Sequence, residues 1–219
     1  MIHVEFHCHS TGSPDSLVDA EQLIRTARQA GLDRIFITDH NSIHEALRAQ
    51  ALAPDLVLIG EEVMTDQGEI LAYLIKEKIP SRMSPMETIA AIREQGGVIS
   101  ISHPFDPRRG WKLENLEKIY SEIDALEVFN ARNLLPEYNL RALEAAQNHG
   151  LLSTAGSDAH TKIEIGRTRM IMPDFNDRES MLEALRVGMI IPKESSPLVR
   201  FNSTFSRVYR RMRKSWETR

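Results

Sequence analysis

Two short motifs place metal-binding side chains two residues apart. His7 and His9 form the first motif, and Asp158 and His160 form the second. Residues i and i+2 of an extended strand lie on the same face, so each pair can bind one ion. Imidazole and carboxylate groups are the usual ligands of hydrolytic metal sites. The two motifs therefore predict a metal-dependent hydrolase.

Further candidate ligands lie between these motifs, most of them at the ends of apolar segments. They are Asp15, His40, Glu62 and His103. A lone histidine at such a place is more often structural, but five of the eight histidines occur at these ends, together with three carboxylates. We interpret His3, His44 and His149 as structural; His44 is the least settled of the three, because it follows His40 by one helical turn and could face the site. Cys8 should point to the opposite face of its strand as a buried thiol.

Apolar segments of strand length alternate with amphipathic segments of helix length along the chain. The predicted strands are residues 2–6, 34–38, 56–60, 70–75, 98–102, 125–129, 152–155, 168–172 and 189–191. The predicted helices are residues 19–30, 43–52, 85–94, 113–120, 137–149 and 179–186. This alternation predicts a largely parallel sheet covered by helices, closed into a barrel or a similar shape. Catalytic groups of such barrels lie at the carboxyl ends of the strands.

Composition narrows the class of protein. The chain has 219 residues, 42% of them hydrophobic and 26% charged, which fits one globular domain. No apolar stretch reaches the roughly 18 residues of a membrane helix. A single cysteine and the lack of a secretory signal predict a cytoplasmic protein. The net charge of −4 argues against a globally basic nucleic-acid binder.

The last residues depart from this balance. Six cationic residues occur between Arg207 and Arg219, with large apolar side chains at helical spacing from Phe205 to Trp216. We expect residues 201–219 to form a basic amphipathic helix, packed on the domain or extending from it. Its basic face is interpreted as solvated, with contact to RNA or to an anionic substrate as the alternative.

The ordered motifs resemble the PHP (polymerase and histidinol phosphatase) superfamily of metal-dependent phosphoesterases. They are His7-Cys8-His9-Ser10, Ser13-Pro14-Asp15-Ser16, Thr38-Asp39-His40-Asn41, Gly60-Glu61-Glu62, Ser102-His103-Pro104 and Gly156-Ser157-Asp158-Ala159-His160. The resemblance implies an α/β fold, a distorted (β/α)7 barrel, which we expect in residues 1–200.

The resemblance also assigns the ligands to separate ions that share a bridging glutamate. The first ion would be held by His7, His9, Glu62 and Asp158, the second by Asp15, His40 and His160, and a third by Glu62 with His103. Strand alternation by itself sends either Glu61 or Glu62 inward, and the resemblance selects Glu62. Manganese, zinc and iron are the usual metals of the family, and mixed nitrogen and oxygen ligands do not select among them.

Two positions depart from the family pattern. Many members carry a histidine where this chain has Glu69. Members with three ions carry one more between the His103 strand and the final Asp-x-His, where this chain has Glu127 and Asn130. We therefore expect two or three divalent ions. Glu69, Glu127 and Asn130 are candidates for additional ligands or for residues that support the ligands.

Two cations that share a water lower its pKa, and the resulting hydroxide can attack phosphorus. His103 and His160 are candidates for the group that protonates the leaving oxygen. Arg132 and Arg167 follow predicted strand ends or ligands and are candidate phosphate-binding residues. Trp111 either stacks on a nucleobase or, the preferred interpretation, packs the loop at 102–111.

The predicted function is hydrolysis of a phosphate monoester or diester of a small metabolite or nucleotide. One alternative is 5′-end exonuclease activity on short RNA, with the basic terminus and Trp111 as its support. Another is a non-catalytic regulatory module that only binds metal. Histidinol phosphate is a further family substrate that no residue selects, and an amidohydrolase-like reaction would lack the Asp-x-His pairing.

Overall fold

The computed structural model describes residues 1–196, so the basic helix expected at 201–219 lies outside the described residues. Within them, one nine-stranded sheet has the order β7-β6-β5-β4-β3-β2-β1-β8-β9. Its strands are β1 (Ile2–Glu5), β2 (Arg34–Ile37), β3 (Val57–Met64), β4 (Glu69–Tyr73), β5 (Val98–Ile101), β6 (Ala125–Asn130), β7 (Leu152–Gly156), β8 (Arg169–Met172) and β9 (Met189–Ile191). The α/β prediction is confirmed.

Two parallel groups of strands make up most of the sheet. Strands β1, β2 and β3 are parallel to one another, as are β5, β6 and β7. Between the groups, β4 is antiparallel to both of its neighbours. The expected parallel order fails there because β3 and β4 are joined by a short turn, closed by a hydrogen bond of 2.9 Å from Thr65 N to Gly68 O, with no helix to reverse the chain.

The segments that follow β1 and β7 close the sheet into a nearly complete barrel. Cys8 pairs with Ala159 in a parallel bridge. The amide of His9 donates to the carbonyl of Ala159 over 2.8 Å, and the amide of Ala159 donates to the carbonyl of His7 over 3.3 Å. We call this pairing the seam. It brings the first and the last metal-binding motif side by side and confirms the barrel prediction.

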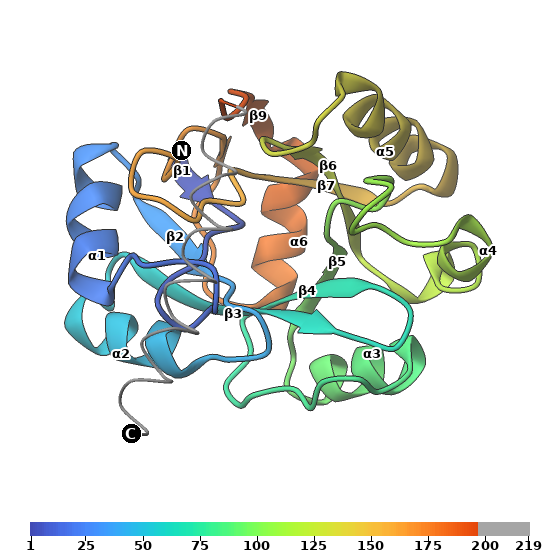
Figure 1. The fold of residues 1–219 in the computed structure, drawn as a ribbon, viewed down its shortest axis with the longest axis horizontal. Coiled ribbons are helices and arrows are strands. Elements are labelled where there is room, and N and C mark those ends of the chain that lie inside the picture. The colour runs from blue at the N-terminus through green and yellow to red at the C-terminus, as the bar shows by residue number, and fades with distance from the viewer. Residues whose placement is uncertain (197–219) are drawn as a thin grey trace, which may run out of the picture.

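In Figure 1 the helices lie around the periphery of the sheet, except the last one, which lies at the middle of the view and packs on inward side chains. The helices are α1 (Ala20–Gln29), α2 (His44–Leu52), α3 (Pro85–Glu94), α4 (Leu113–Leu116), α5 (Pro136–His149) and α6 (Arg178–Val187). The predicted helix at 113–120 is wrong in length, because α4 ends early and a short 3-10 helix (Tyr120–Glu122) follows it. Among residues 1–196, no helix combines the length and the apolar character needed to cross a membrane.

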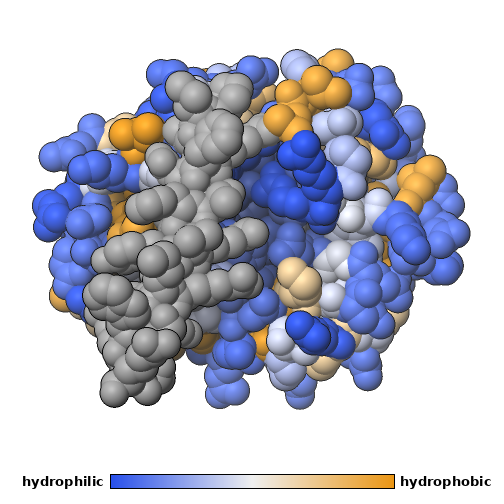
Figure 2. Space-filling model, in the orientation of Figure 1, coloured by the Kyte–Doolittle hydropathy of each residue, from blue (hydrophilic) through white to orange (hydrophobic). Residues whose placement is uncertain are grey.

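Two apolar cores hold the barrel in shape. One lies between the strands and the outer helices, and it contains Leu23, Ile35 and Ile92. The other joins inward side chains such as Phe6 and Tyr73 to Met181 and Leu185 of α6. Arg178 fixes the start of α6 by donating to both carboxylate oxygens of Asp124, over 2.8 and 2.5 Å. On the face shown in Figure 2, most of the described surface is hydrophilic and apolar side chains form only separate patches.

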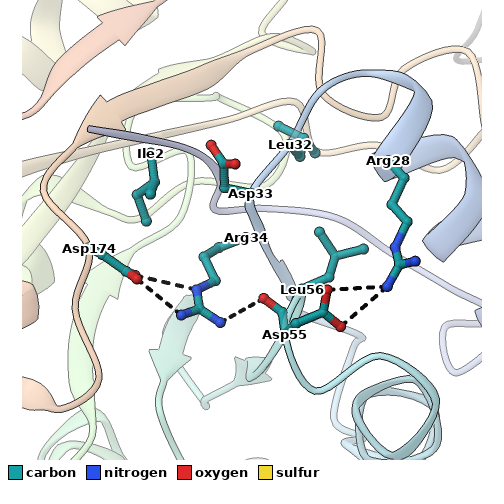
Figure 3. A pocket seen from close by; sticks show the side chains of 8 residues that line it. All are labelled: Ile2, Arg28, Leu32, Asp33, Arg34, Asp55, Leu56 and Asp174. Atoms are coloured by element: carbon teal, nitrogen blue, oxygen red, sulfur yellow. Dashed lines mark hydrogen bonds and ion pairs between the residues drawn. The ribbon is translucent and has the colours of Figure 1, made fainter.

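A charged pocket of about 330 Å³ lies at the amino-terminal ends of β1, β2 and β3 (Figure 3). Its walls carry two ion pairs, Arg28 with Asp55 and Arg34 with Asp174, each at 3.2 Å. The predicted ligands follow the carboxyl ends of the same strands. The pocket is therefore at the opposite end of the barrel from the ligands, where α/β barrels place residues that serve stability.

Candidate metal centre

The predicted ligands converge at one end of the barrel. His7 and His9 follow β1, His40 follows β2, Glu62 belongs to β3, His103 follows β5, and Asp158 and His160 follow β7. Parallel strands bring their carboxyl ends to one edge, which explains the convergence. All of these side chains are buried except that of His40, which is 19% exposed.

Glu62 lies at the centre of the cluster. Its Oε2 atom is 3.4 Å from His7 Nε2, 3.3 Å from His9 Nε2 and 3.0 Å from His40 Nδ1. Its other oxygen, Oε1, is 3.1 Å from His103 Nε2. Glu61 points away, and its Oε2 accepts a hydrogen bond from the amide of Ile79 over 2.9 Å. Glu62 is thus the inward residue of the pair, and its role as the bridging ligand stays a prediction.

The first set of ligands is compact. His7 Nε2 and His9 Nε2 are 3.1 Å apart. Asp158 Oδ1 lies 3.7 Å from the former and 3.3 Å from the latter. With Glu62, these side chains direct two nitrogens and two oxygens at one small volume, as the resemblance implies for the first ion.

The second set lies directly beside the first. Asp15 Oδ2 is 3.3 Å from His160 Nε2 and 3.7 Å from His40 Nε2. The ring of His9 packs against both imidazoles, with centroids 4.5 Å from that of His40 and 4.2 Å from that of His160. The two sets are therefore contiguous, and the assignment of each side chain to an ion stays a prediction.

Of the residues that depart from the family pattern, Glu69 lies beside the predicted ligands and Glu127 lies behind them. Glu69 is the first residue of β4, and because β4 is antiparallel its start lies at the same end as the ligands. Its carboxylate is 3.5 Å from His40 Nδ1 and 3.4 Å from His103 Nε2. Glu69 can therefore serve as an additional ligand beside Glu62.

Glu127 contacts two predicted ligands, His7 and His103, on the side away from the cluster. Its Oε1 lies 2.8 Å from His7 Nδ1, which leaves His7 Nε2 directed at the cluster. Its Oε2 accepts from the amide of His103 and from Asn130 Nδ2, over 2.8 and 2.9 Å. A carboxylate behind a ligating imidazole fixes its tautomer and its orientation.

Residues that were not among the predicted ligands complete these supports. Asp39 accepts a hydrogen bond of 2.7 Å from Ser13 Oγ, and Ser13 Oγ lies 3.0 Å from His9 Nδ1. Under the seam, Glu5 accepts from the amides of His7 and Ser157 over 3.2 and 2.8 Å. Burial raises the pKa of Glu5 to about 7, although these hydrogen bonds oppose the rise.

The donor atoms of the cluster differ in protonation. Burial would lower the pKa of His7 and of His40, but the neighbouring carboxylates, Glu127 first for His7 and Glu62 first for His40, raise both pKa values well above the usual range, so a metal ion would displace a proton from these two rings. Burial, together with the rings of His160 and His40, lowers the pKa of His9 to about 4, so this imidazole is neutral at pH 7. Burial alone would raise the pKa of Glu62, but the adjacent histidines, His7 first, hold it well below the usual range. Neutral imidazole and ionised carboxylate are the forms that bind a metal ion.

These residues fit divalent cations on two further grounds. Asp158 Oδ1 and His40 Nδ1 are buried and make no hydrogen bond within the described residues. Their nearest polar contacts are ion-pair contacts between predicted ligands, His40 Nδ1 to Glu62 Oε2 at 3.0 Å and Asp158 Oδ1 to His9 Nε2 at 3.3 Å. A cation between these side chains would give both buried atoms the interaction that a hydrogen bond would otherwise supply. Three overlapping groups also bring ligand atoms within 4.8 Å of one another: His7, His9 and Glu62; His9, His40 and His160; and His40, Glu62 and Glu69.

The two predicted phosphate-binding arginines differ in position. Arg132 is buried, with Nη1 at 2.5 Å from His160 Nδ1 and Nε at 3.5 Å from Glu164. Arg167 is half-buried, and across residues 1–196 no hydrogen bond or ion pair joins its side chain to a predicted ligand. Arg132 therefore positions a ligand, while the phosphate-binding role of both arginines stays a prediction.

Trp111 and His44 resolve alternatives that the sequence left open, and the structure also places Cys8 and Arg109. Trp111 is buried, and its Nε1 donates to the carbonyl of Glu69 over 3.1 Å, so it packs the loop. Cys8 is fully buried, as expected. His44 is 82% exposed and therefore lies outside the cluster. Arg109, which the sequence analysis did not select, donates to Asp158 Oδ2 over 2.5 Å.

Comparison with known proteins agrees with this geometry. The model of the PHP domain matches residues 5–101, and a PHP-associated model matches residues 136–190. An uncharacterised protein of Methanocaldococcus jannaschii is 30% identical over 178 residues, which cover 79% of this chain and 71% of that protein. A protein of Caldicellulosiruptor saccharolyticus named "Probable phosphatase" is 24% identical over 85% of this chain and 97% of its own length.

A solved structure shows the same fold. It is a two-domain protein from Bacteroides vulgatus that contains a "predicted PHP-like metal-dependent phosphoesterase", with a TM-score of 0.73 and 19% identity. The match covers 87% of this chain and 64% of that one, so the present chain spans less than two thirds of that protein. The family models, the relatives and the ordered ligands around Glu62 agree, and the chain belongs to the PHP superfamily.

Proposed function

We propose that this protein is a metal-dependent phosphoesterase that hydrolyses a phosphate ester of a small metabolite or nucleotide. The observation that carries the proposal is the position of Glu62, whose two oxygens lie within 3.0–3.4 Å of nitrogens from His7, His9, His40 and His103. A carboxylate so placed can bridge two cations. The family and the relative named as a phosphatase support the reaction class.

We assign two roles to the side chains of the site, cation binding and proton donation. His7, His9, Glu62, Asp158, Asp15, His40 and His160 would hold the cations, with Glu69 and His103 as further ligands. Divalent cations bound there would lower the pKa of water and offset charge on the phosphoryl oxygens. His103 is the preferred proton donor to the leaving oxygen. Its Nε2 faces Glu62 and the cluster, so the ring can pass a proton to the leaving oxygen only where Nε2 does not bind a cation, and the ligand and donor roles of His103 are alternatives.

A metal-reconstitution assay tests this proposal. Protein stripped with EDTA should hydrolyse neither p-nitrophenyl phosphate nor its bis ester, and added Mn²⁺ should restore turnover of at least one of them. His40→Ala should lose bound manganese and activity together, because it removes a nitrogen from two of the ligand groups. His44→Ala is the matched control and should retain both, since His44 is exposed.

Elemental analysis distinguishes a metal-dependent enzyme from a module that only binds metal. A protein that binds manganese stoichiometrically yet turns over no ester among nucleotides, bisphosphonucleotides and sugar phosphates would favour the non-catalytic module. The RNA alternative receives no support from Trp111, because that ring is buried. Its other support, the basic terminus, lies outside the described residues.

A further inference from the structure

Arg109 is held at the ligand cluster by a rigid loop between β5 and α4. The loop turns through hydrogen bonds from the amide of Gly110 to the carbonyl of Asp106, at 2.6 Å, and from the amide of Trp111 to the carbonyl of Pro104, at 3.0 Å. A Cβ on Gly110 would lie 2.5 Å from the latter carbonyl, so only glycine fits. The indole hydrogen bond to Glu69 fixes the loop to the start of β4.

Two carboxylates fix the guanidinium of Arg109 on two of its three nitrogens. Nε donates to Asp106 Oδ2 over 3.1 Å, and Nη1 donates to Asp158 Oδ2 over 2.5 Å. The other oxygen of Asp158 faces His7 and His9, so the cation sits directly behind a predicted ligand. Burial opposes the charge, but Asp158 and Asp106 raise the pKa of Arg109 above its usual value and keep it protonated.

The third nitrogen has no partner. Within the described residues, Nη2 of Arg109 is buried and makes no hydrogen bond, although the side chain as a whole is 32% exposed. A buried N–H donor of a cation without an acceptor is costly, which indicates that an acceptor is missing. Among the described residues, the carboxylates of Asp106 and Asp158 already accept from Nε and Nη1, so an acceptor for Nη2 has to come from another group, such as a bound anion.

We propose that Nη2 of Arg109 binds a phosphoryl oxygen of the substrate, so that the loop between β5 and α4 recognises the phosphate group. This inference rests on the proposed function. Because the interaction is between charges, it favours a dianionic monoester over a monoanionic diester. Arg108, the adjacent residue, is exposed and offers a matched control with the same charge and nearly the same position in the chain.

The test compares wild type, Arg109→Gln, Arg109→Lys and Arg108→Gln, all loaded with Mn²⁺. Calorimetry gives the Kd of inorganic phosphate, and elemental analysis gives the manganese content. We expect Arg109→Gln to weaken phosphate binding about tenfold to hundredfold, the usual effect of a lost charge-assisted hydrogen bond, at unchanged manganese content. Arg109→Lys should be intermediate, because lysine keeps the charge but cannot span both carboxylates. Arg108→Gln should match the wild type.

Steady-state kinetics adds a second measure. The KM of Arg109→Gln should rise more for p-nitrophenyl phosphate than for the bis ester. An unchanged phosphate Kd, a loss of manganese that accounts for the whole effect, or an equal loss in Arg108→Gln would each overturn the inference. If Arg109→Gln does not fold in a thermal melt, Arg109→Lys decides by the same criteria. A wild type that binds phosphate but hydrolyses no ester contradicts the proposed function, and the binding comparison still tests Arg109.

Discussion

Glu61 and Glu62 are chemically identical neighbours in opposite environments. Glu62 faces four histidines, and its pKa is held low despite its burial. Glu61 faces the amide of Ile79, and burial raises its pKa to about 7. One step along a strand reverses the face and therefore the role of the side chain.

This pair gives a matched test at the residue scale. Glu62→Gln should reduce manganese content and lower activity by at least about 100-fold, because it removes the charge between the ligands. Glu61→Gln should stay within about twofold of the wild type, since its amide oxygen can still accept from Ile79. Elemental analysis and ester hydrolysis measure both effects. Equal loss in the two variants would mean that Glu62 acts through folding rather than as a ligand.

Residue types at the site were predictable, but the partners of individual atoms were not. Histidines and carboxylates after apolar segments pointed to the cluster, and their order pointed to the family. The contacts of Arg109 with Asp158 and of Glu127 with His7 depend on loop and rotamer conformations. His103 and Asp158 also adopt positive φ angles of 29° and 50°; histidine and aspartate tolerate such angles better than most residues, but the sequence alone does not place them at these two positions.

At the scale of elements, strands were easier to predict than their directions. Apolar runs marked every strand of the described sheet, and the glycine after the helix at 137–149 marked its end. The direction of β4 depends on whether a turn or a helix precedes it, and the short polar segment at 65–68 did not decide this. The end of α4 likewise depends on packing around Leu116 rather than on helix propensity.

Close approach of β7 to β1 requires a glycine. A Cβ on Gly156 would lie 2.3 Å from the Cβ of His7 and 2.9 Å from its backbone nitrogen. Gly156→Ala should therefore destabilise the fold by about 1–3 kcal/mol and reduce manganese content, because His7 must move. Chemical denaturation and elemental analysis measure this. Ser153→Ala, on the partly exposed part of the same strand, is the control, and an unaffected Gly156→Ala would show that the seam tolerates a wider gap.

For the molecule as a whole, the ligands come from strands distributed around the entire barrel. A cation bound by Glu62 of β3 and by residues that follow β1, β2 and β7 would cross-link segments that are far apart in sequence. Binding to the folded state alone stabilises it by about 2.7 kcal/mol at 100 times the Kd of the ion.

The melting temperature should therefore rise with Mn²⁺. For a chain of this size we expect an increase of about 5–10 °C at 100 times the Kd, and EDTA should reverse it. Differential scanning calorimetry over a manganese titration measures the effect. An identical melting temperature with and without saturating metal would show that the ligand cluster does not bind the ion in the folded state.

The single cysteine of the chain lies in the seam, between two of the histidines. Cys8 is fully buried, and burial raises the pKa of its thiol well above the usual value, so reagents cannot modify it while the two segments stay paired. The rate at which Cys8 is alkylated therefore measures how often the two segments of the seam separate. Comparing the Cys8 alkylation rate with and without metal therefore shows, without an engineered label, whether bound ions reduce the opening of the barrel.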